Sequence, residues 1–589
     1  MKRSSYTITL LLAALLLAAA GCRKGTLTLA PFDVLTPGSA FNSEEDLKLY
    51  TNSFYKIFPS ANDIIRGDAM SDISVTKSVN AYLVPGGFSA TQATGWSWSD
   101  LRNVNYFLQH FRQAKVPDDV KNNYEGIARF FRAWFYFSMV KKFGDVPWYS
   151  KPLEVGDSAL YKPKDPRTLV MDSVLADLNY ACDNIDATKD NTASLVTKWA
   201  ALAFKSRVCL FEGTFRKYHT ELQLTGTASQ WLTEAVNAAQ AVMTGNKYSI
   251  HKNASNPAAS YRDLFINSTP SSDEIILSYV CSAALQVLND ANWYYTSATY
   301  GDRLSFNKTF INTYSNIDGT RFTEMPGYDT LSFPSEVKNR DLRLQQTIRM
   351  GNYKRSDGSA APPDFTYTYT GYEPLKFTLD SKATDGVAKN DNSIPLIRYA
   401  EVLLNYAEAR AELGPLDAAD WNATIKPLRA RAGLTNTDMP STPDVYMNQN
   451  FFPDISDATL LEIRKERGIE LALEGFRYDD LKRWNAGDLL KKQYLGLYVP
   501  AMNTLYDLNG DGKPDVSFVS STPATKVSGV YYFIIDGSQA ALSNGTSGNI
   551  IWLNNIARDW DTYKYFYPIP YNELVLNHNL VQNTGWDHP

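Results

Sequence analysis

A stretch near the C-terminus has the residue types and the spacing of a calcium-binding loop. Oxygen-bearing side chains occupy loop positions 1, 3, 5 and 9, and the glycine at position 6 permits the tight turn that wraps a backbone around a hard cation. The candidate ligands, with the Lys513 carbonyl at position 7, are Asp507, Asn509, Asp511, Lys513 and Asp515. Position 12 is Phe518 instead of glutamate, and Asn-Gly and Asp-Gly pairs also favour plain polar turns. We expect a structural Ca²⁺, with an ion-free turn as the alternative.

Aromatic side chains form a second group with binding potential. They make up 13% of the chain, and the 36 tyrosines outnumber the 28 phenylalanines. Such rings in loop-like segments suit a protein that stacks them against sugars or other planar ligands. The rings expected to do so are Trp96, Trp98, Trp293, Tyr294, Tyr295 and Tyr300, with Asn292 and Arg303 as polar contacts. For each ring taken singly, burial in the core is the alternative, and alternation predicts that one of Trp96 and Trp98 points inward.

Three carboxylates near residue 470 have the spacing of one helix face. Glu466, Glu470 and Glu474 lie four residues apart, interleaved with Arg464, Arg467 and Arg477. Opposite charges at this spacing ordinarily form ion pairs, whereas a glycosidase needs two carboxyl groups across a cleft with separated pKa values. The five histidines are scattered, and no Gly-x-Ser-x-Gly or His-Glu-x-x-His motif occurs. We therefore expect structural ion pairs and no catalytic site.

The N-terminus carries the features of an export signal. Lys2 and Arg3 precede an apolar run from Ile8 to Leu17, which is too short for a permanent membrane span. Small residues then lead into Cys22, a pattern that resembles a bacterial lipoprotein signal. In that class the cut falls before the cysteine, whose lipid holds a soluble body on a membrane. We expect residues 1–21 to be removed and Cys22 to be lipidated; an ordinary signal peptide with a chance cysteine is the alternative.

Charge and the remaining cysteines limit the other possibilities. The formal net charge is −5, and no block of lysine and arginine favours nucleic acid as a partner. Cys182, Cys209 and Cys281 are odd in number, and the first two have apolar neighbours. We expect buried free thiols and no disulfide framework.

The elements that must position these groups are mainly helices. Apolar residues at helical spacing, with caps and glycine stops, predict helices within 44–58, 99–111, 124–143, 167–185, 197–213, 231–245, 398–413, 421–432 and 459–485. Alanines at the seam of 197–213 and 231–245 indicate close helix packing of the tetratricopeptide type. Residues 251–395 read as a long irregular insertion, 396–487 as helices again, and 488–589 as a loop-rich tail. The expected fold is a mainly α, tetratricopeptide-like helical-repeat scaffold.

Several stretches together resemble the SusD/RagB family of nutrient-binding lipoproteins. The resemblance rests on motifs that follow the family's order along nearly the whole mature chain, in an N-terminal region 22–250 and a C-terminal region 251–589. In Asn339–Leu344, Leu342 replaces the family's proline. The other motifs are Arg129–Phe137, Phe143–Pro147, Ala203–Gly213, Pro395–Ala409, Arg464–Arg477, Asp480–Trp484 and the ending from Tyr567 to Asn583.

The resemblance implies a role without catalysis. A member of this family captures a glycan at the cell surface and acts as a hinged lid over a SusC-like TonB-dependent transporter in the outer membrane. The helical repeats would pack on the barrel, and the irregular insertions would hold the ligand. A peptide-binding RagB-like subunit and, less favoured, a surface glycoside hydrolase are the alternatives. Arg23 and Lys24 follow Cys22, where many surface members carry acidic residues, so surface display is a separate expectation from lipidation.

Overall fold

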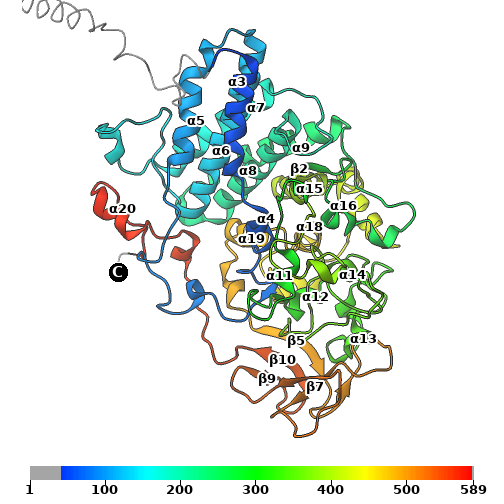
Figure 1. Cartoon of the computed structure of the whole chain (residues 1–589). Helices are drawn as coiled ribbons and strands as arrows, with labels where there is room; N and C mark the ends of the chain where they lie inside the picture. The colour runs from blue at the N-terminus through cyan, green and yellow to red at the C-terminus, as the bar shows by residue number, and fades with distance from the viewer. Residues whose placement is uncertain (1–40, 587–589) are drawn as a thin grey trace, which may run out of the picture.

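The computed structural model describes residues 41–586, and its body is a mainly helical scaffold (Figure 1). Successive long helices pack against one another, and α15 links the C-terminal helices to the N-terminal ones. The principal helices are α3 (Glu44–Asn52), α5 (Ser99–His110), α6 (Asp118–Phe143), α7 (Arg167–Asn184), α8 (Lys198–Tyr218), α9 (Ala228–Thr244), α15 (Tyr399–Leu413), α16 (Ala418–Arg431) and α18 (Ala458–Glu470). This arrangement confirms the predicted helical scaffold. Among the described residues, no helix is both long and apolar enough to span a bilayer.

Two glycines show where helix ends were predicted rightly and wrongly. Gly144, with φ 76°, caps α6 as expected. Helix α8, however, continues through Gly213 to Tyr218, so the predicted stop is wrong. A Cβ at Gly213 would lie 2.8 Å from Cγ of Leu232 on α9. This glycine therefore serves the close approach of two helices instead of ending one.

The predicted helix over 459–485 is broken in the structure. Helix α18 ends at Glu470 and α19 spans Arg477–Arg483. Leu473 and Gly475 between them have φ values of 66° and 79°, in the left-handed region that a helix cannot contain. A Cβ at Gly67 would lie 2.6 Å from Cα of Gly475, so the turn lets two backbones meet. Glu474 consequently lies outside the helix that carries Glu466 and Glu470.

The insertion contains short elements joined by long connections. Its helices are α10 (Asp263–Ile266), α11 (Ala291–Tyr295), α12 (Lys308–Ile311), α13 (Phe333–Glu336) and α14 (Leu344–Thr347). Strand β2 (Ile275–Tyr279) pairs antiparallel with β4 (Ile394–Arg398), and β1 (Ser74–Val75) pairs with β3 (Ser305–Phe306). The first pair brings the two ends of the insertion together, and the second fastens its middle to the N-terminal part of the chain.

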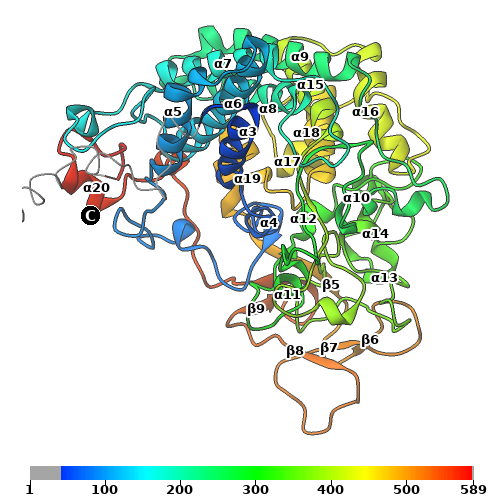
Figure 2. The ribbon, with the colours of Figure 1, turned by 45° about the horizontal axis from the view of Figure 1, so that its top comes forward.

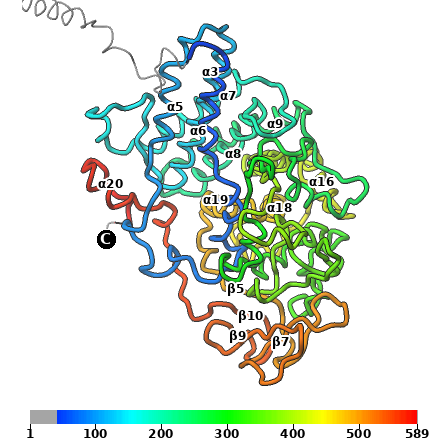
Figure 3. The backbone as a smooth tube through the Cα atoms, in the orientation of Figure 1, coloured from blue at the N-terminus to red at the C-terminus, as the bar shows by residue number. Residues whose placement is uncertain are grey.

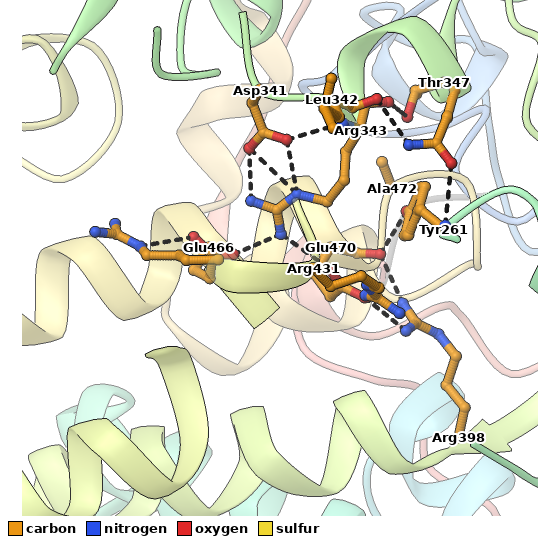
Figure 4. A network of polar contacts seen from close by, with 12 residues as sticks. Tyr261, Asp341, Leu342, Arg343, Thr347, Arg398, Arg431, Glu466, Glu470 and Ala472 are labelled. Carbon is orange, nitrogen blue, oxygen red and sulfur yellow. Dashed lines mark hydrogen bonds and ion pairs between the residues drawn. The ribbon is translucent and has the colours of Figure 1, made fainter. Parts of the chain in front are cut away.

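A buried ion network ties the insertion to α16 and α18 (Figure 4). The Glu470 carboxylate forms ion pairs with Arg343 at 2.9 Å and with Arg398 at 2.7 Å. It also forms an ion pair with Arg431. Arg343 lies 2.7 Å from Asp341 as well. All of these side chains are buried. The expectation that the three glutamates are structural is confirmed, because each is neutralised inside the core.

The partners in this network differ from the sequence-adjacent ones. Arg398 also reaches Glu474 at 2.7 Å, and Arg343 reaches Glu466 at 2.5 Å. The neighbouring arginines pair elsewhere, Arg464 with Glu412, Arg467 with Asp480 and Arg477 with Asp72. Charges that alternate along one stretch thus serve contacts between distant segments.

The tail is more ordered than its composition predicts. One sheet has the order β5 (Tyr494–Val499), β10 (Gly548–Trp552), β9 (Ala540–Leu542), and the other has β6 (Leu505–Tyr506), β7 (Val516–Val519), β8 (Tyr531–Ile534). Strands β7 and β8 are parallel, and their exposed connection, residues 520–530, runs outward at the bottom of Figure 2. These strands are too short for their alternation to stand out in the sequence.

The C-terminal segment of the described chain packs against the end of α6. The Asn583 side-chain amide donates to the carbonyl of Phe143 at 2.9 Å and to that of Tyr567 at 2.7 Å. The amide of Tyr567 donates to Lys142 O at 2.8 Å. Figure 3 shows this red C-terminal segment, which includes α20 (Tyr571–Leu576), beside the blue N-terminal part. The motifs at 143–147 and 567–583 are therefore one structural unit.

Candidate ligand-binding site

A groove lies where the insertion meets the small sheets of the tail. It has a volume of about 580 Å³ and is formed by the insertion segments 349–367 and 382–385, the C-cap of α11 and the tail around 515–531. Its polar and aromatic lining includes Thr296, Arg349, Arg355, Asp364, Tyr367, Lys382, Asp385, Asp515 and Tyr531. Rings and hydrogen-bonding groups thus share one concave surface, as ligand sites require.

Two tyrosines bring half-buried rings to the groove. Tyr531 begins β8 and pairs in parallel register with Val516. Tyr367 lies in a turn that Asp364 closes, since the Tyr367 amide donates to Asp364 O at 2.8 Å. Neither ring was among the sequence candidates. The alternation of threonine with aromatic residues from Phe365 to Tyr369 was the available signal.

The polar side chains of the groove differ in how many of their hydrogen-bonding groups are paired within the protein. Arg355 donates to Asp385 at 2.7 Å, and the side-chain amide of Asn292 donates to the same carboxylate oxygen at 2.8 Å. Arg349 instead lies 3.1 Å from Glu373, which is fully buried beneath the groove. Burial raises the pKa of Glu373 to about 7, and Arg349 offsets this only in part.

An aromatic pair joins α11 to the segment that follows it. Trp293 and Tyr300 stack with ring centroids 3.3 Å apart and planes 7° from parallel, and both are half-buried. The Arg66 guanidinium lies 5.3 Å from the centre of the Tyr300 ring. Thr296, between them in sequence, lines the groove. The structure therefore stacks these two predicted residues on each other, although neither ring lines the groove.

Other predicted contacts on α11 belong to the core. Tyr294 and Tyr295 are buried, and the Tyr295 hydroxyl donates to Ile65 O at 2.7 Å. Asn292 is also buried, and its side-chain oxygen accepts from the Leu379 amide at 2.6 Å. Four consecutive residues of a helix cannot all face a ligand, because one face of α11 must cover the scaffold. These three residues are therefore removed from the candidate site.

Arg303 supports buried rings instead of the groove. Its guanidinium lies 5.2 Å from the centre of the Tyr369 ring, and that ring stacks on Trp552 at 3.9 Å. Tyr369 and Trp552 are both buried. Arg303 is not among the residues that line the groove.

Family comparisons identify the class of protein that carries this groove. The model described as "SusD family" matches residues 267–586, and a model described as "Starch-binding associating with outer membrane" matches residues 43–210. The chain belongs to the SusD family. These two models match in chain order and together extend from α3 to the end of the described residues.

Individual relatives of this SusD family member are distant. SusD-like protein P38 of Formosa agariphila is 26% identical over 419 residues, which cover 67% of this chain and 73% of that protein. SusD-like protein P2 of the same species is 24% identical and covers 82% and 91%. The crystal structure of a SusD-like carbohydrate-binding protein of Bacteroides fragilis matches with a TM-score of 0.68 at 22% identity and covers 92% of this chain and 99% of that one. This likeness to solved structures establishes the fold.

Trp96 and Trp98 occupy a different part of the SusD fold. They contact each other edge-on at 5.5 Å, and Trp96 packs against Phe143 at 5.0 Å. Trp96 is 8% exposed while Trp98 is half-buried, so one ring of the pair points inward as predicted. Both line a cavity of about 320 Å³ with Tyr149, and no residue of that lining also lines the groove.

The predicted calcium loop connects β6 to β7. Both carboxylate oxygens of Asp507 accept backbone amides, from Gly510 at 2.6 Å and Gly512 at 2.7 Å. The Asp511 carboxylate likewise accepts the Lys513 amide at 2.9 Å. Within residues 41–586, no group of three or more His, Cys, Asp or Glu side chains is placed to hold a metal ion. The loop is closed here by its own hydrogen bonds, and the calcium site stays a prediction.

The three cysteines of the described chain form no disulfide. Cys182, Cys209 and Cys281 are free and buried, as expected. Burial raises the pKa of the Cys182 thiol to about 12, so this group is unreactive near neutral pH. Cys22 and the signal segment lie outside the described residues.

Proposed function

We propose that this chain is a lipid-anchored glycan-binding protein that delivers its ligand to a SusC-like TonB-dependent transporter. The observation that supports a glycan most is the groove, which places Tyr367 and Tyr531 beside charged and hydroxyl-bearing groups. Membership of the SusD family supplies the class of function. Lipidation at Cys22 and a place on the outer membrane complete the proposal.

The groove has what recognition of a sugar chain requires. The C–H faces of a pyranose ring are apolar and pack on aromatic rings, while its hydroxyl groups need donors and acceptors. Tyr367 and Tyr531 would pack on the C–H faces of the sugar. Thr296, Asp364 and Lys382 would form hydrogen bonds with its hydroxyl groups. Trp293 on α11 and Tyr300 after it would add a stacked pair of rings beyond the groove lining.

The proposed role involves no bond cleavage. Glu466, Glu470 and Glu474 are committed to buried ion pairs. In the groove, Asp385 is held by Arg355 and Asn292. We therefore propose binding alone, with transport left to the partner barrel.

A titration with matched variants tests the proposed site. Purified wild-type protein is titrated calorimetrically against a panel of polysaccharides, followed by Tyr367→Ala and Tyr531→Ala. Tyr571→Ala is the control, because this tyrosine is 50% exposed on α20 and does not line the groove. We expect saturable binding that both groove variants weaken and the control does not. Binding of peptides and of no glycan would favour the RagB-like alternative and contradict the proposal.

A further inference from the structure

The guanidinium of Arg349, in the wall of the groove, has two donors without a hydrogen-bond partner among residues 41–586. Arg349 lines the groove and is 5% exposed. Its Nε and Nη2 atoms are buried and donate to no acceptor among the residues that the structure describes. Its Nη1 lies 3.1 Å from a carboxylate oxygen of Glu373.

Such a guanidinium is costly to bury. Arginine carries five N–H donors, and each buried donor without an acceptor loses its bonds to water without a replacement. Arg355, in the same wall, shows the usual solution, since it donates to Asp380 O at 2.9 Å and to Asp385 at 2.7 Å. Because Arg349 lines the groove, these two unpaired donors point to an acceptor that enters the groove from outside the chain.

The carboxylates that line the groove do not serve as the missing acceptor for Arg349. Asp385 is already neutralised by Arg355. Burial raises the pKa of Asp515, the Leu508 amide opposes this, and the charges of Asp507 and Asp511 add to the increase. One oxygen of Asp364 accepts the Thr366 amide at 2.8 Å. None of the hydrogen bonds found among the described residues joins these carboxylates to Arg349.

We propose that the groove takes an acidic glycan, whose sugars carry carboxylate or sulfate groups, and that Arg349 binds the anionic group. This inference rests on the proposed glycan-binding function and narrows its substrate class. The planar fork of arginine matches the paired oxygens of a carboxylate or sulfate, whereas a single sugar hydroxyl leaves one of the two donors unpaired. Tyr367 and Tyr531 are then placed to contact the face of the same sugar.

Glu373 competes with such a ligand for Arg349. Both anions would draw on one guanidinium, and Glu373 holds it from beneath the groove at 3.1 Å. Replacing Glu373 by glutamine keeps its shape and removes its charge. The two positions therefore predict opposite effects, with Arg349→Gln lowering and Glu373→Gln raising the preference for an acidic ligand.

Matched ligand pairs test the inference. The probes are oligogalacturonate against its methyl ester, and a sulfated galactan oligosaccharide against its desulfated form, each titrated calorimetrically. We expect the acidic member of at least one pair to bind about tenfold more tightly than its neutral counterpart, as one charge-assisted contact allows. Arg349→Gln should abolish that ratio. Lys56→Gln, at an exposed lysine that does not line the groove, should keep the ratio.

The outcomes separate this inference from the function beneath it. Binding of neutral glycans with no preference for the acidic members, or a ratio that survives Arg349→Gln, overturns the inference and leaves glycan binding intact. Absence of binding to every glycan contradicts the proposed function itself. If Arg349→Gln does not fold, Glu373→Gln decides, because an unchanged or lowered ratio in that variant overturns the inference.

Discussion

Replacing Glu470 by glutamine should strongly destabilise the protein. This carboxylate is fully buried and pairs with Arg343, Arg398 and Arg431. Glutamine keeps the volume but leaves three guanidinium groups short of one negative charge. Breaking a buried ion pair from one side costs about 3–5 kcal/mol, because the remaining charge stays in the core without compensation.

The effect should depend on pH in a defined direction. Burial alone would raise the pKa of Glu470, but Arg431, Arg398 and Arg343 lower it below the usual 4.5. A carboxylate whose folded pKa is lowered contributes stability above its unfolded pKa and loses it as pH falls towards the folded value. The difference between wild type and Glu470→Gln should therefore be complete at neutral pH and shrink below about pH 4.5.

Urea unfolding followed by circular dichroism measures this difference. The matched control is Asp488→Asn, which breaks the ion pair with Lys491, because the Asp488 side chain is 76% exposed. An exposed pair contributes about 0–1 kcal/mol, so the control should unfold nearly as the wild type does. A Glu470→Gln variant within about 1 kcal/mol of wild type at neutral pH would refute the assignment of this network to stability.

Three further predictions concern the ligand site, the loop and the anchor. Trp293→Ala removes the ring stacked on Tyr300 and should weaken glycan affinity about three- to tenfold in calorimetry; equal affinity would exclude the pair from the site. Calcium should raise the thermal midpoint of wild type but not of Asp507→Ala, whereas equal midpoints with calcium and with chelator would contradict a calcium loop. Cys22→Ala should abolish incorporation of labelled palmitate and release the protein from membranes, and continued labelling would show that lipid attaches elsewhere.

The helical scaffold can be predicted from the sequence because long helices leave a strong periodic pattern of apolar residues. The end of α6 at Gly144 follows from residues next to one another in the chain. Gly213 misleads, since its role depends on Leu232 of another helix. The break after Glu470 depends in the same way on Gly67, 408 residues before Gly475. Contacts between distant segments thus determine the helix ends that local sequence patterns predict wrongly.

The ligand site is less predictable for the same reason. Trp293 and Tyr300 could be selected because aromatic residues gather in a loop-like segment, and the structure stacks them. Asn292 is directly beside Trp293 in the sequence, yet its side-chain amide is fully hydrogen-bonded inside the protein. It accepts from the Leu379 amide and donates to Asp385. Tyr531 reaches the groove only through the pairing of β8 with β7, which no single stretch reveals.

The most direct test of the account combines binding with product analysis. The purified full-length protein is titrated with each polysaccharide of the panel, and the same mixtures are then analysed for chain length by chromatography. The account predicts saturable binding of at least one polysaccharide whose chain length stays unchanged after prolonged incubation. Shortened products from a homogeneous preparation, or no binding to any polysaccharide, would contradict it.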